Sequence, residues 1–387
     1  MRRAPAWAAA TGGAGRAAWR ALTRPRPARR GRLATAGLGL ALATAVLALA
    51  PNSIGEATGG PPRVGFSFSP ELVHGGRDPL AVLSDLLDAL HPDVVRLPVF
   101  WEAVAPTADS LDFGGVDALV DVVRQHDAST GDTTRVVLVV GVRNIGYPEV
   151  HVPGWVSAYL APRVPELVKL ASYRQYLSAS FSRYRSEPLL EAWQLENEPL
   201  DNIQVLSSGP ISLSQSQLNG ELRLARSIDR VHPVMLTTYN SSTLALDQQG
   251  SGPLTWLRSL LPGPRPAGHP AAVLGAGQVM GLDVYVSTPA TPLADAGIAQ
   301  RVAWKVESLK YWSRQAAALG KPLWIAEMQA APWNGQGEFG PADLVSSADA
   351  YRTSGVAVVL FWQVEDWTVS PEWMAAGKQA VEELRAG

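Results

Sequence analysis

The stretch Leu190-Glu191-Ala192-Trp193-Gln194-Leu195-Glu196-Asn197-Glu198-Pro199 begins as a mostly apolar strand and ends abruptly in a carboxylate beside an amide. A second apolar run, Leu323-Trp324-Ile325-Ala326, ends in the same way at Glu327, far downstream. Two carboxylates at strand ends can act together in acid–base and nucleophilic chemistry if the fold brings those ends together. The rest of the chain must therefore supply a sheet whose strand ends meet.

Strand-like runs alternate with helical patterns from Arg63 onward. The eight strand-like runs are Val64–Ser69, Val94–Phe100, Arg135–Gly141, Leu190–Leu195, Val234–Tyr239, Val279–Val286, Pro322–Met328 and Val356–Trp362. The expected helices are Pro79–Leu90, Val116–His126, Pro165–Arg185, Ser214–Val231, Ile298–Leu319, Pro341–Thr353 and Glu372–Arg385, with a short one around Leu254–Leu261. This order predicts an α/β fold in which the parallel strands close into a (β/α)8 TIM barrel. An open doubly wound sheet is the alternative, although no GxGxxG motif follows the first strand.

Composition excludes several classes of site. The chain of 387 residues has no cysteine, which rules out thiol nucleophiles, thiolate metal sites and disulfides. Its formal net charge of −2 gives no indication of a nucleic-acid partner. The six histidines show no metal-ligand spacing, and no GxxxxGK(S/T) or GxSxG motif is present. We therefore expect no metal ion, organic cofactor or nucleic acid.

The N-terminal region differs from the rest. Residues 1–32 contain nine arginines and no acidic residue, and the apolar segment 33–50 follows. Eighteen helical residues span about 27 Å, close to the roughly 30 Å hydrocarbon core of a bilayer. The pattern predicts a transmembrane signal anchor, or alternatively a cleaved signal peptide, with the basic segment in the cytoplasm. Residues 51–62 are expected to be a linker, and residues 63–387 a catalytic barrel outside the cytoplasm.

Seven of the eight predicted strands end in polar or aromatic side chains, although their bodies are mostly apolar. These side chains are Arg96, Arg143, Asn144, Asn197, Glu198, Tyr239, Asn240, Asp283, Tyr285, Glu327 and Trp362. In a barrel they would share the C-terminal face, where barrel active sites form. Four tryptophans that follow strand ends are candidate platforms for a ligand, namely Trp101, Trp155, Trp333 and Trp367.

With these residues in this order, the barrel region resembles the retaining glycoside hydrolases of clan A, which are built on the (β/α)8 barrel. In that clan, the acid/base is the Glu of an Asn-Glu pair that closes strand four, and the nucleophile is a Glu that closes strand seven. Glu198 and Glu327 match these two positions. Arg96 matches the arginine of strand two, Tyr285 the tyrosine of strand six, and Trp362 the tryptophan of strand eight.

The chain departs from family 5 of the clan at two strand ends. In that family, histidines usually lie near the ends of strands three and six. Here those positions carry Arg143-Asn144 and Asp283-Val284-Tyr285. The resemblance therefore implies a cellulase-type enzyme similar to families 5 and 39, with the exact family unresolved.

The resemblance implies an enzyme that cleaves β-glycosidic bonds of an oligo- or polysaccharide by double displacement. The N-terminal segment predicts that this enzyme is membrane-anchored or secreted. Glu198 would donate and then accept the proton, while Glu327 would attack the anomeric carbon, with the carboxyl groups about 5–5.5 Å apart. The charge of Glu327 would raise the pKa of Glu198. The expected substrate-binding residues are Arg96, Asn197, Tyr285, Trp362, Asn144, Tyr239 and Trp333, with Asn197 on the 2-hydroxyl group.

Other functions and roles remain open at this point. A non-catalytic carbohydrate-binding barrel and a transglycosylase would use the same scaffold, and a metal-dependent hydrolase would need clustered histidines at strand ends. Glu196 is expected to contact sugar or to pair with a nearby arginine. Asp283 fits either sugar binding or barrel structure. His151, beside Trp155, is the one histidine that we expect near the site.

Overall fold

The computed structural model describes residues 60–146, 149–156, 169–201, 213–249, 268–288, 296–333 and 338–386. The predicted anchor helix at 33–50 and the short helix around Leu254–Leu261 lie outside these residues, as does most of the predicted linker. Within the described part of the chain, no helix combines the length and the hydropathy that a bilayer span requires.

Eight parallel strands close into a barrel in the order in which they occur in the sequence, so the predicted fold is confirmed and the doubly wound sheet is excluded. The strands are β1 Arg63–Ser67, β2 Val94–Phe100, β3 Arg135–Gly141, β4 Leu190–Leu195, β5 Val234–Tyr239, β6 Val279–Val284, β7 Leu323–Gln329 and β8 Val358–Trp362. The predicted bounds of β2 to β5 match the observed ones. Each of these four runs is almost wholly buried, which is the state that a continuous apolar run predicts.

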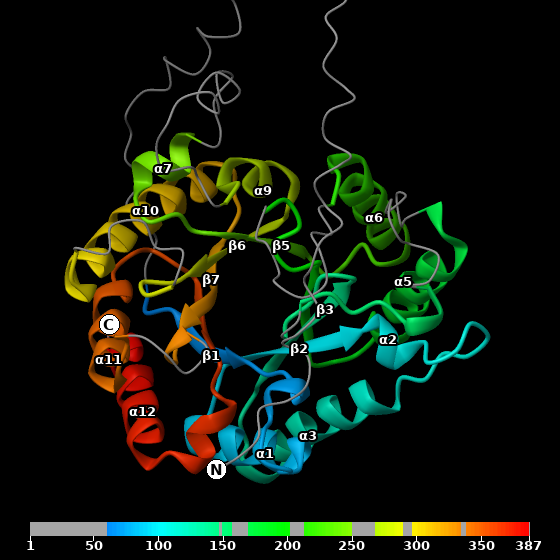
Figure 1. Ribbon diagram of the computed structural model, residues 1–387, viewed down its shortest axis with the longest axis horizontal. Coiled ribbons are helices and arrows are strands. Elements are labelled where there is room, and N and C mark those ends of the chain that lie inside the picture. The colour runs from blue at the N-terminus through cyan, green and yellow to red at the C-terminus, as the bar shows by residue number, and fades with distance from the viewer. Residues whose placement is uncertain are drawn as a thin grey trace, which may run out of the picture. The chain divides into compact units, whose positions relative to one another are not determined.

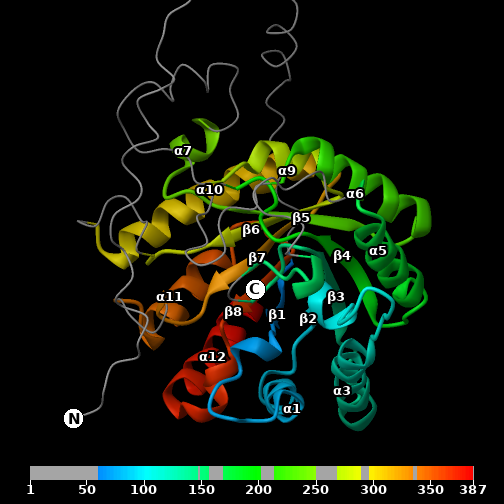
Figure 2. The same ribbon diagram turned by 45° about the vertical axis from the view of Figure 1, so that its right-hand side comes forward.

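Helices surround the strands (Figure 1). They are η1 Pro70–Leu72, α1 Pro79–Leu90, α2 Trp101–Val104, α3 Gly114–Thr130, α5 Ala171–Tyr184, α6 Gln215–Ile228, α7 Leu244–Gln249, α9 Pro270–Ala276, α10 Ile298–Ala318, α11 Pro341–Tyr351, η4 Glu365–Val369 and α12 Pro371–Arg385. Neighbouring helices pack against one another, as α1 does against α3 and α11 against α12. The α1–α3 pair lies side by side in both views (Figure 2).

Helix α1 shows why the predicted bounds were accurate. Asp78 caps its first turn by accepting from the Leu80 backbone N–H at 3.0 Å, and Pro79 occupies the first helical position. The leucines of this helix from Leu83 to Leu90 are buried against the barrel. The helix ends at His91, whose backbone takes the left-handed conformation with φ +44°.

Strands β1 and β6 end earlier than predicted because side chains take over their backbone hydrogen bonds. The Ser69 N–H donates to the carboxylate of Glu365 at 2.8 Å, so β1 ends at Ser67. The N–H of Val286 donates to the side-chain oxygen of Gln329 at 2.9 Å, and β6 ends at Val284. Both strands stop at the face where their ends turn toward the cavity described below.

The core has two main layers. One lies between the sheet and the surrounding helices and includes Leu83, Leu177 and Leu309. The other fills the barrel interior with Val94, Val137, Ala192, Met235, Val279, Trp324, Ala326, Val358 and Leu360. Because strand side chains alternate between faces, Arg96 continues the inward row begun by Val94. The apolar interior layer therefore forms the floor beneath the polar strand ends.

Candidate functional site at the C-terminal face of the barrel

A bulge in β7 turns Glu327 into the barrel. Ile325 pairs with Val359 and Met328 with Phe361, so Ala326 and Glu327 together stand opposite the single residue between them in β8. Without the extra residue, the alternation of side chains would point Glu327 outward, since Ala326 already faces the interior. Bulges commonly redirect a side chain beside an active site. This one places the carboxylate among the inward residues of β2 and β6.

Glu327 is held by a buried arginine and a tyrosine. Arg96 donates from Nη2 to Glu327 Oε1 at 2.7 Å, and the Tyr285 hydroxyl donates to the other carboxylate oxygen. The remaining donors of Arg96 bond to Ser67 Oγ at 2.8 Å and to Gln194 Oε1 at 2.9 Å. Arg96 is fully buried and Glu327 is 4% exposed. A carboxylate with two such donors is fixed in position.

Glu198 lies in the opposite electrostatic environment. Burial raises its pKa well above the ordinary value, and the charges of Asp283, Asp201, Glu149 and Glu327 add to the effect in that order. Glu327 therefore acts in the predicted direction, but it is not the main cause. Glu198 is 3% exposed, so the neutral, protonated acid is the form that this environment favours.

The backbone at Glu198 is locked in an uncommon conformation. Its φ is +44°, in the left-handed region that non-glycine residues rarely adopt. The N–H of Glu198 donates to Thr237 Oγ1 at 2.9 Å, and its carbonyl accepts from Arg143 Nη1 at 2.6 Å. Strained backbone that is held by its surroundings is frequent at functional sites. Arg143 Nη2 also lies 3.9 Å from the Glu198 carboxyl.

Asp283 is a third acidic group in the same place. Both of its carboxyl oxygens are buried, and neither has a partner with good hydrogen-bond geometry. Burial raises the pKa of Asp283 well above the ordinary value, the charge of Glu327 raises it further, and Arg96 and Glu198 oppose the shift. Since a buried carboxylate without a good partner is very costly, this environment favours the protonated form of Asp283.

Asp283→Asn should flatten the dependence of stability on pH. Folded Asp283 keeps a proton that the unfolded chain releases above a pH of about 4, so the parent loses stability as pH rises from there toward the folded pKa. Removing that one proton should make the slope of unfolding free energy shallower by at most about 1.4 kcal/mol per pH unit. Denaturant titrations between pH 5 and 8 measure the slope, with Asp109→Asn as an exposed control. Parallel slopes for parent and Asp283→Asn would show that Asp283 is ionised in the fold.

The carboxylate of Glu327 opens into a cavity. Its lining residues are Leu72, Gly146, Glu149, Asn197, Tyr285, Glu327, Trp333, Trp362 and Gln363. Aromatic rings form much of its wall. Two of them, Trp333 and Tyr285, pack edge-on with ring centroids 5.2 Å apart. Asn197 Oδ1 accepts from Gln194 at 3.0 Å, which orients its amide NH₂ as a donor for a bound molecule.

The structure brings most of the predicted site residues together, but not all of them face the cavity. Asn197, Tyr285, Glu327, Trp333 and Trp362 line it. Among the four candidate platform tryptophans, Trp333 is the cavity residue, whereas Trp101 and Trp367 are core residues and Trp155 donates to the Ala105 carbonyl.

Three predicted substrate-binding residues have other positions. Asn144 is fully buried, and its amide donates to the Val139 carbonyl at 2.9 Å while its oxygen accepts from its neighbour's N–H, so it shapes the loop after β3. Arg96 is also fully buried and acts through Glu327. Tyr239 stacks on Tyr285 with ring centroids 6.0 Å apart, which makes it a support for the cavity wall.

Glu196 lies beneath the site and does not reach the cavity. It is fully buried, and it accepts from the backbone N–H of Arg143 at 2.6 Å and from the Tyr173 hydroxyl at 2.6 Å. Arg143 contacts Glu196 through its backbone N–H, whereas its guanidinium pairs with Glu149, so the expected side-chain pairing is not formed with this arginine. Burial raises the pKa of Glu196 to about 7. Its carboxyl occupies the space directly over Gly141, whose φ is +146°.

Gly141→Ala should be strongly destabilising, because the new Cβ would lie 2.4 Å from the Glu196 carboxyl carbon in an unfavourable backbone conformation. The hydrogen bonds of Glu196 keep its side chain from moving away, so we expect the free energy of unfolding to fall by roughly 3 kcal/mol or more. Gly131→Ala is the matched control, since φ is +84° there but the space is open. Its expected cost is about 1–2 kcal/mol. Equal losses in urea denaturation would mean that Glu196 moves aside freely.

Sequence reasoning missed the residues that connect the predicted ones. Gln194 joins Arg96 to Asn197, Thr237 holds the Glu198 backbone, and Glu149 lines the cavity. Gln194 could have been found from the sequence, because it lies two residues after Ala192 on β4 and so faces the barrel interior. Glu149 follows no strand, so the sequence gave no sign that it would line the cavity.

Two groups of described residues could offer three ligands to a metal ion. One comprises Glu71, Glu102 and His151, and the other His91, His126 and Asp132. His151 donates or accepts at Nδ1 with Glu102 at 2.9 Å, and its Nε2 lies 3.3 Å from where a Cβ on Gly146 would be. Gly146 lines the cavity, so His151 lies near the site as predicted.

No protein-family model matches the chain, and no curated protein matches it in sequence. Solved structures do match its fold. The GH5_18 protein from Streptomyces cattleya, in complex with GlcNAc, aligns with a TM-score of 0.56 and 16% identity over 84% of this chain and 80% of that one. A variant of that protein in complex with Manβ1-4GlcNAc gives the same values. A β-galactosidase from Halorubrum lacusprofundi aligns with a TM-score of 0.54 and 16% identity over 83% of this chain and 58% of that one. The barrel fold that the resemblance to clan A predicted is confirmed.

Proposed function

We propose that this chain is a retaining glycoside hydrolase that cleaves β-glycosidic bonds. The observation that carries the proposal is the contrast between two buried carboxyl groups at the C-terminal ends of β4 and β7. Glu327 is bound by Arg96 and Tyr285, whereas burial and nearby acidic groups raise the pKa of Glu198. A carboxylate held by two donors and a second carboxyl group with a raised pKa are the pair that acid-assisted glycoside cleavage requires.

In the first step, Glu327 attacks the anomeric carbon and forms a covalent glycosyl ester. The bond to the leaving oxygen breaks at the same time, and Glu198 gives that oxygen its proton. Arg96 and Tyr285 both donate to the oxygens of Glu327. They hold the carboxylate in position while its negative charge is lost to the new ester bond. Once the charge of Glu327 is gone, one cause of the raised pKa of Glu198 is removed.

In the second step, Glu198 acts as the base. It takes a proton from water, and the water oxygen attacks the anomeric carbon while the bond to Glu327 breaks. Two inversions at one carbon give net retention of configuration. The proton that Glu198 gains restores the resting state, so protons balance over the cycle.

The cavity lining offers the contacts that a sugar ring uses. Trp362 and Trp333 provide apolar faces, and Tyr285 lies beside the nucleophile. Asn197 presents an amide donor, which we assign to the 2-hydroxyl group. The similar structures bind or are named for β-linked sugars, including Manβ1-4GlcNAc and β-galactoside. We therefore propose β-mannosides, β-galactosides and β-glucosides as the first substrate classes. The N-terminal arginines and apolar segment 33–50 support an extracytoplasmic site of action, either anchored or secreted.

The experiment is hydrolysis by the purified full chain, in mild detergent, across aryl β-glycosides and β-linked polysaccharides. Proton NMR of the first-formed product distinguishes retention from inversion, and an initial β-anomer supports the proposal. An initial α-anomer would refute the retaining mechanism. Transfer to added sugar acceptors in preference to water would identify a transglycosylase. Tight sugar binding without turnover, unchanged in Glu327→Gln, would identify a carbohydrate-binding barrel.

A further inference from the structure

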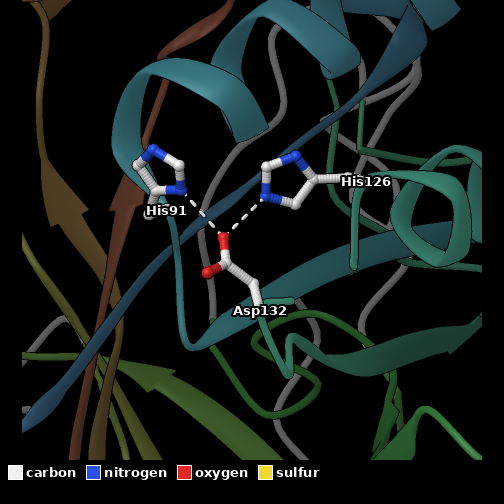
Figure 3. Close-up of side chains that lie close together, drawn as sticks. All are labelled: His91, His126 and Asp132. Carbon is white, nitrogen blue, oxygen red and sulfur yellow. Dashed lines mark hydrogen bonds and ion pairs between the residues drawn. The ribbon is translucent and has the colours of Figure 1, made fainter. Parts of the chain in front are cut away.

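Two histidines and an aspartate meet at the end of the barrel opposite Glu198 and Glu327. His91 ends α1, His126 lies in α3, and Asp132 follows α3 (Figure 3). Both helix ends lead into the N-terminal ends of strands β2 and β3, the face that stabilises barrels and does not carry their active sites. The group is separate from the candidate catalytic site.

The three side chains converge on one point. Asp132 Oδ2 lies 2.8 Å from His91 Nδ1 and 2.9 Å from His126 Nε2, as the dashed lines in Figure 3 show. All three donor atoms lie within 4.8 Å of one another. Ligands at 2.0–2.1 Å from a tetrahedral metal ion are about 3.3 Å apart. The Asp132 oxygen therefore needs to move about half an ångström away from each imidazole nitrogen to admit an ion.

Both ring nitrogens of His126 face carboxylate oxygens. Nδ1 lies 2.8 Å from Asp88 Oδ1, and Nε2 lies 2.9 Å from Asp132 Oδ2. An imidazole that binds a metal ion through one nitrogen commonly donates from the other to a carboxylate. The His126 side chain is only 1% exposed, so its surroundings hold the ring in place.

The surrounding charges agree with a divalent ion. The carboxylates of Asp88 and Asp132 lie beside the imidazoles of His91 and His126. The nearby cation Arg385 is already engaged, since it donates to the His91 carbonyl at 2.7 Å and pairs with Asp93 at 3.1 Å. With a metal ion on Nε2, His126 would keep its proton on Nδ1 and donate it to Asp88. That carboxylate–histidine–metal arrangement is the usual way in which proteins orient a ligating imidazole.

We propose that His91, His126 and Asp132 bind a zinc ion that ties the end of α1 to the end of α3. The ligands are His91 Nδ1, His126 Nε2 and the Asp132 carboxylate, with water completing the tetrahedron, as His91 and Asp132 are partly exposed. Imidazole nitrogens favour Zn²⁺ over Mg²⁺ and Ca²⁺. The histidines are 35 residues apart in sequence, so their spacing matches no local metal motif. The role is structural and does not depend on the proposed hydrolase.

Zinc should raise the thermal stability of the metal-stripped full chain. At a Zn²⁺ concentration about 100 times the Kd, the expected rise in the unfolding midpoint is about 5 °C, and the same concentration of Mg²⁺ should produce none. His91→Asn is the main test variant, because asparagine tolerates the left-handed conformation at this position and the side chain is exposed. The variant should fold normally, lose the zinc-dependent rise, and bind Zn²⁺ at least tenfold more weakly by calorimetry.

Three further variants sharpen the result. Asp132→Asn should also lose the rise, and Asp88→Ala should weaken zinc binding roughly 10-fold by removing the acceptor that orients His126. His232→Asn is the matched control, since His232 pairs only with Asp229 among the described residues and should leave the rise intact. An equal rise in the parent, His91→Asn and Asp132→Asn would assign the ion to another place, such as Glu71, Glu102 and His151. No rise in the parent would show a hydrogen-bonded triad that holds only a proton.

Discussion

Replacing Glu327 by glutamine should reduce hydrolysis on the order of 10⁵-fold while leaving the fold intact. The amide cannot form the glycosyl ester, and removal of a covalent nucleophile typically costs this much in kcat. Glutamine keeps an oxygen for Arg96 and Tyr285, both of which donate to the carboxylate in the parent. Alanine at this position would leave Arg96 buried without its partner, which costs about 3–5 kcal/mol in stability. Initial rates on an aryl β-glycoside and a denaturant titration separate the two effects.

The role of Glu327 can be tested further by azide rescue. In Glu327→Ala, azide can enter the vacated space and attack the anomeric carbon directly, while Glu198 still protonates the leaving group. A β-glycoside should then give an α-glycosyl azide through a single inversion. Glu365→Gln is a suitable control, because Glu365 is equally buried but accepts from Ser69 away from the cavity lining. A β-glycosyl azide from Glu327→Ala would mean that another residue is the nucleophile.

The sequence predicts the barrel well because its strands are buried on both faces. The run Arg135–Gly141 reads as a continuous apolar strand, and every residue after the first is buried. Prediction fails where a side chain replaces a backbone partner. Nothing local to Val286 shows that its N–H will bond to Gln329, which lies 43 residues away.

The candidate site was predictable as a set of strand ends, but the directions of its side chains were not. Glu327 follows an inward-facing alanine, so simple alternation would turn it away from the barrel, and only the bulge at Ala326 and Glu327 brings it inward. A bulge depends on the pairing of neighbouring strands, which one strand does not encode. For Asn144 the prediction went wrong in the other direction. Its position at a strand end indicated a contact with a ligand, but the side chain is buried and bonds to the backbone of β3 and of its own loop.

The electrostatics of Glu198 also required the fold. Sequence reasoning assigned the raised pKa of Glu198 to the charge of Glu327, whereas burial comes first, followed by the charges of Asp283, Asp201 and Glu149. These three acids come from three separate segments of the chain. Their sum explains how Glu198 remains a proton donor, and it implies that several acids beside the nucleophile set the pH range of activity.

Replacing Glu198 by alanine should therefore affect substrates according to their leaving groups. For a sugar or alkyl leaving group, which needs protonation, kcat/KM should fall about 10²- to 10⁴-fold. For an aryl group acidic enough to depart unprotonated, the first step should be nearly unchanged, and the glycosyl-enzyme should accumulate because no base activates water. Burst kinetics on the two substrates measure both effects. A loss of the same size on both would indicate a structural role for Glu198.

The pH profile gives an independent test of the same variant. Because the pKa of Glu198 is raised, its protonated form persists above the ordinary range for a glutamate and disappears as pH rises through that pKa. The parent should therefore lose kcat/KM on the alkaline side, and Glu198→Ala should lack that alkaline limb. Glu191→Ala, at the other end of β4 and paired with Arg63, should keep the parent profile. If the alkaline limb persists in Glu198→Ala, another residue must be the acid. Asp283 would be the first residue to test, because it too is buried and has a raised pKa.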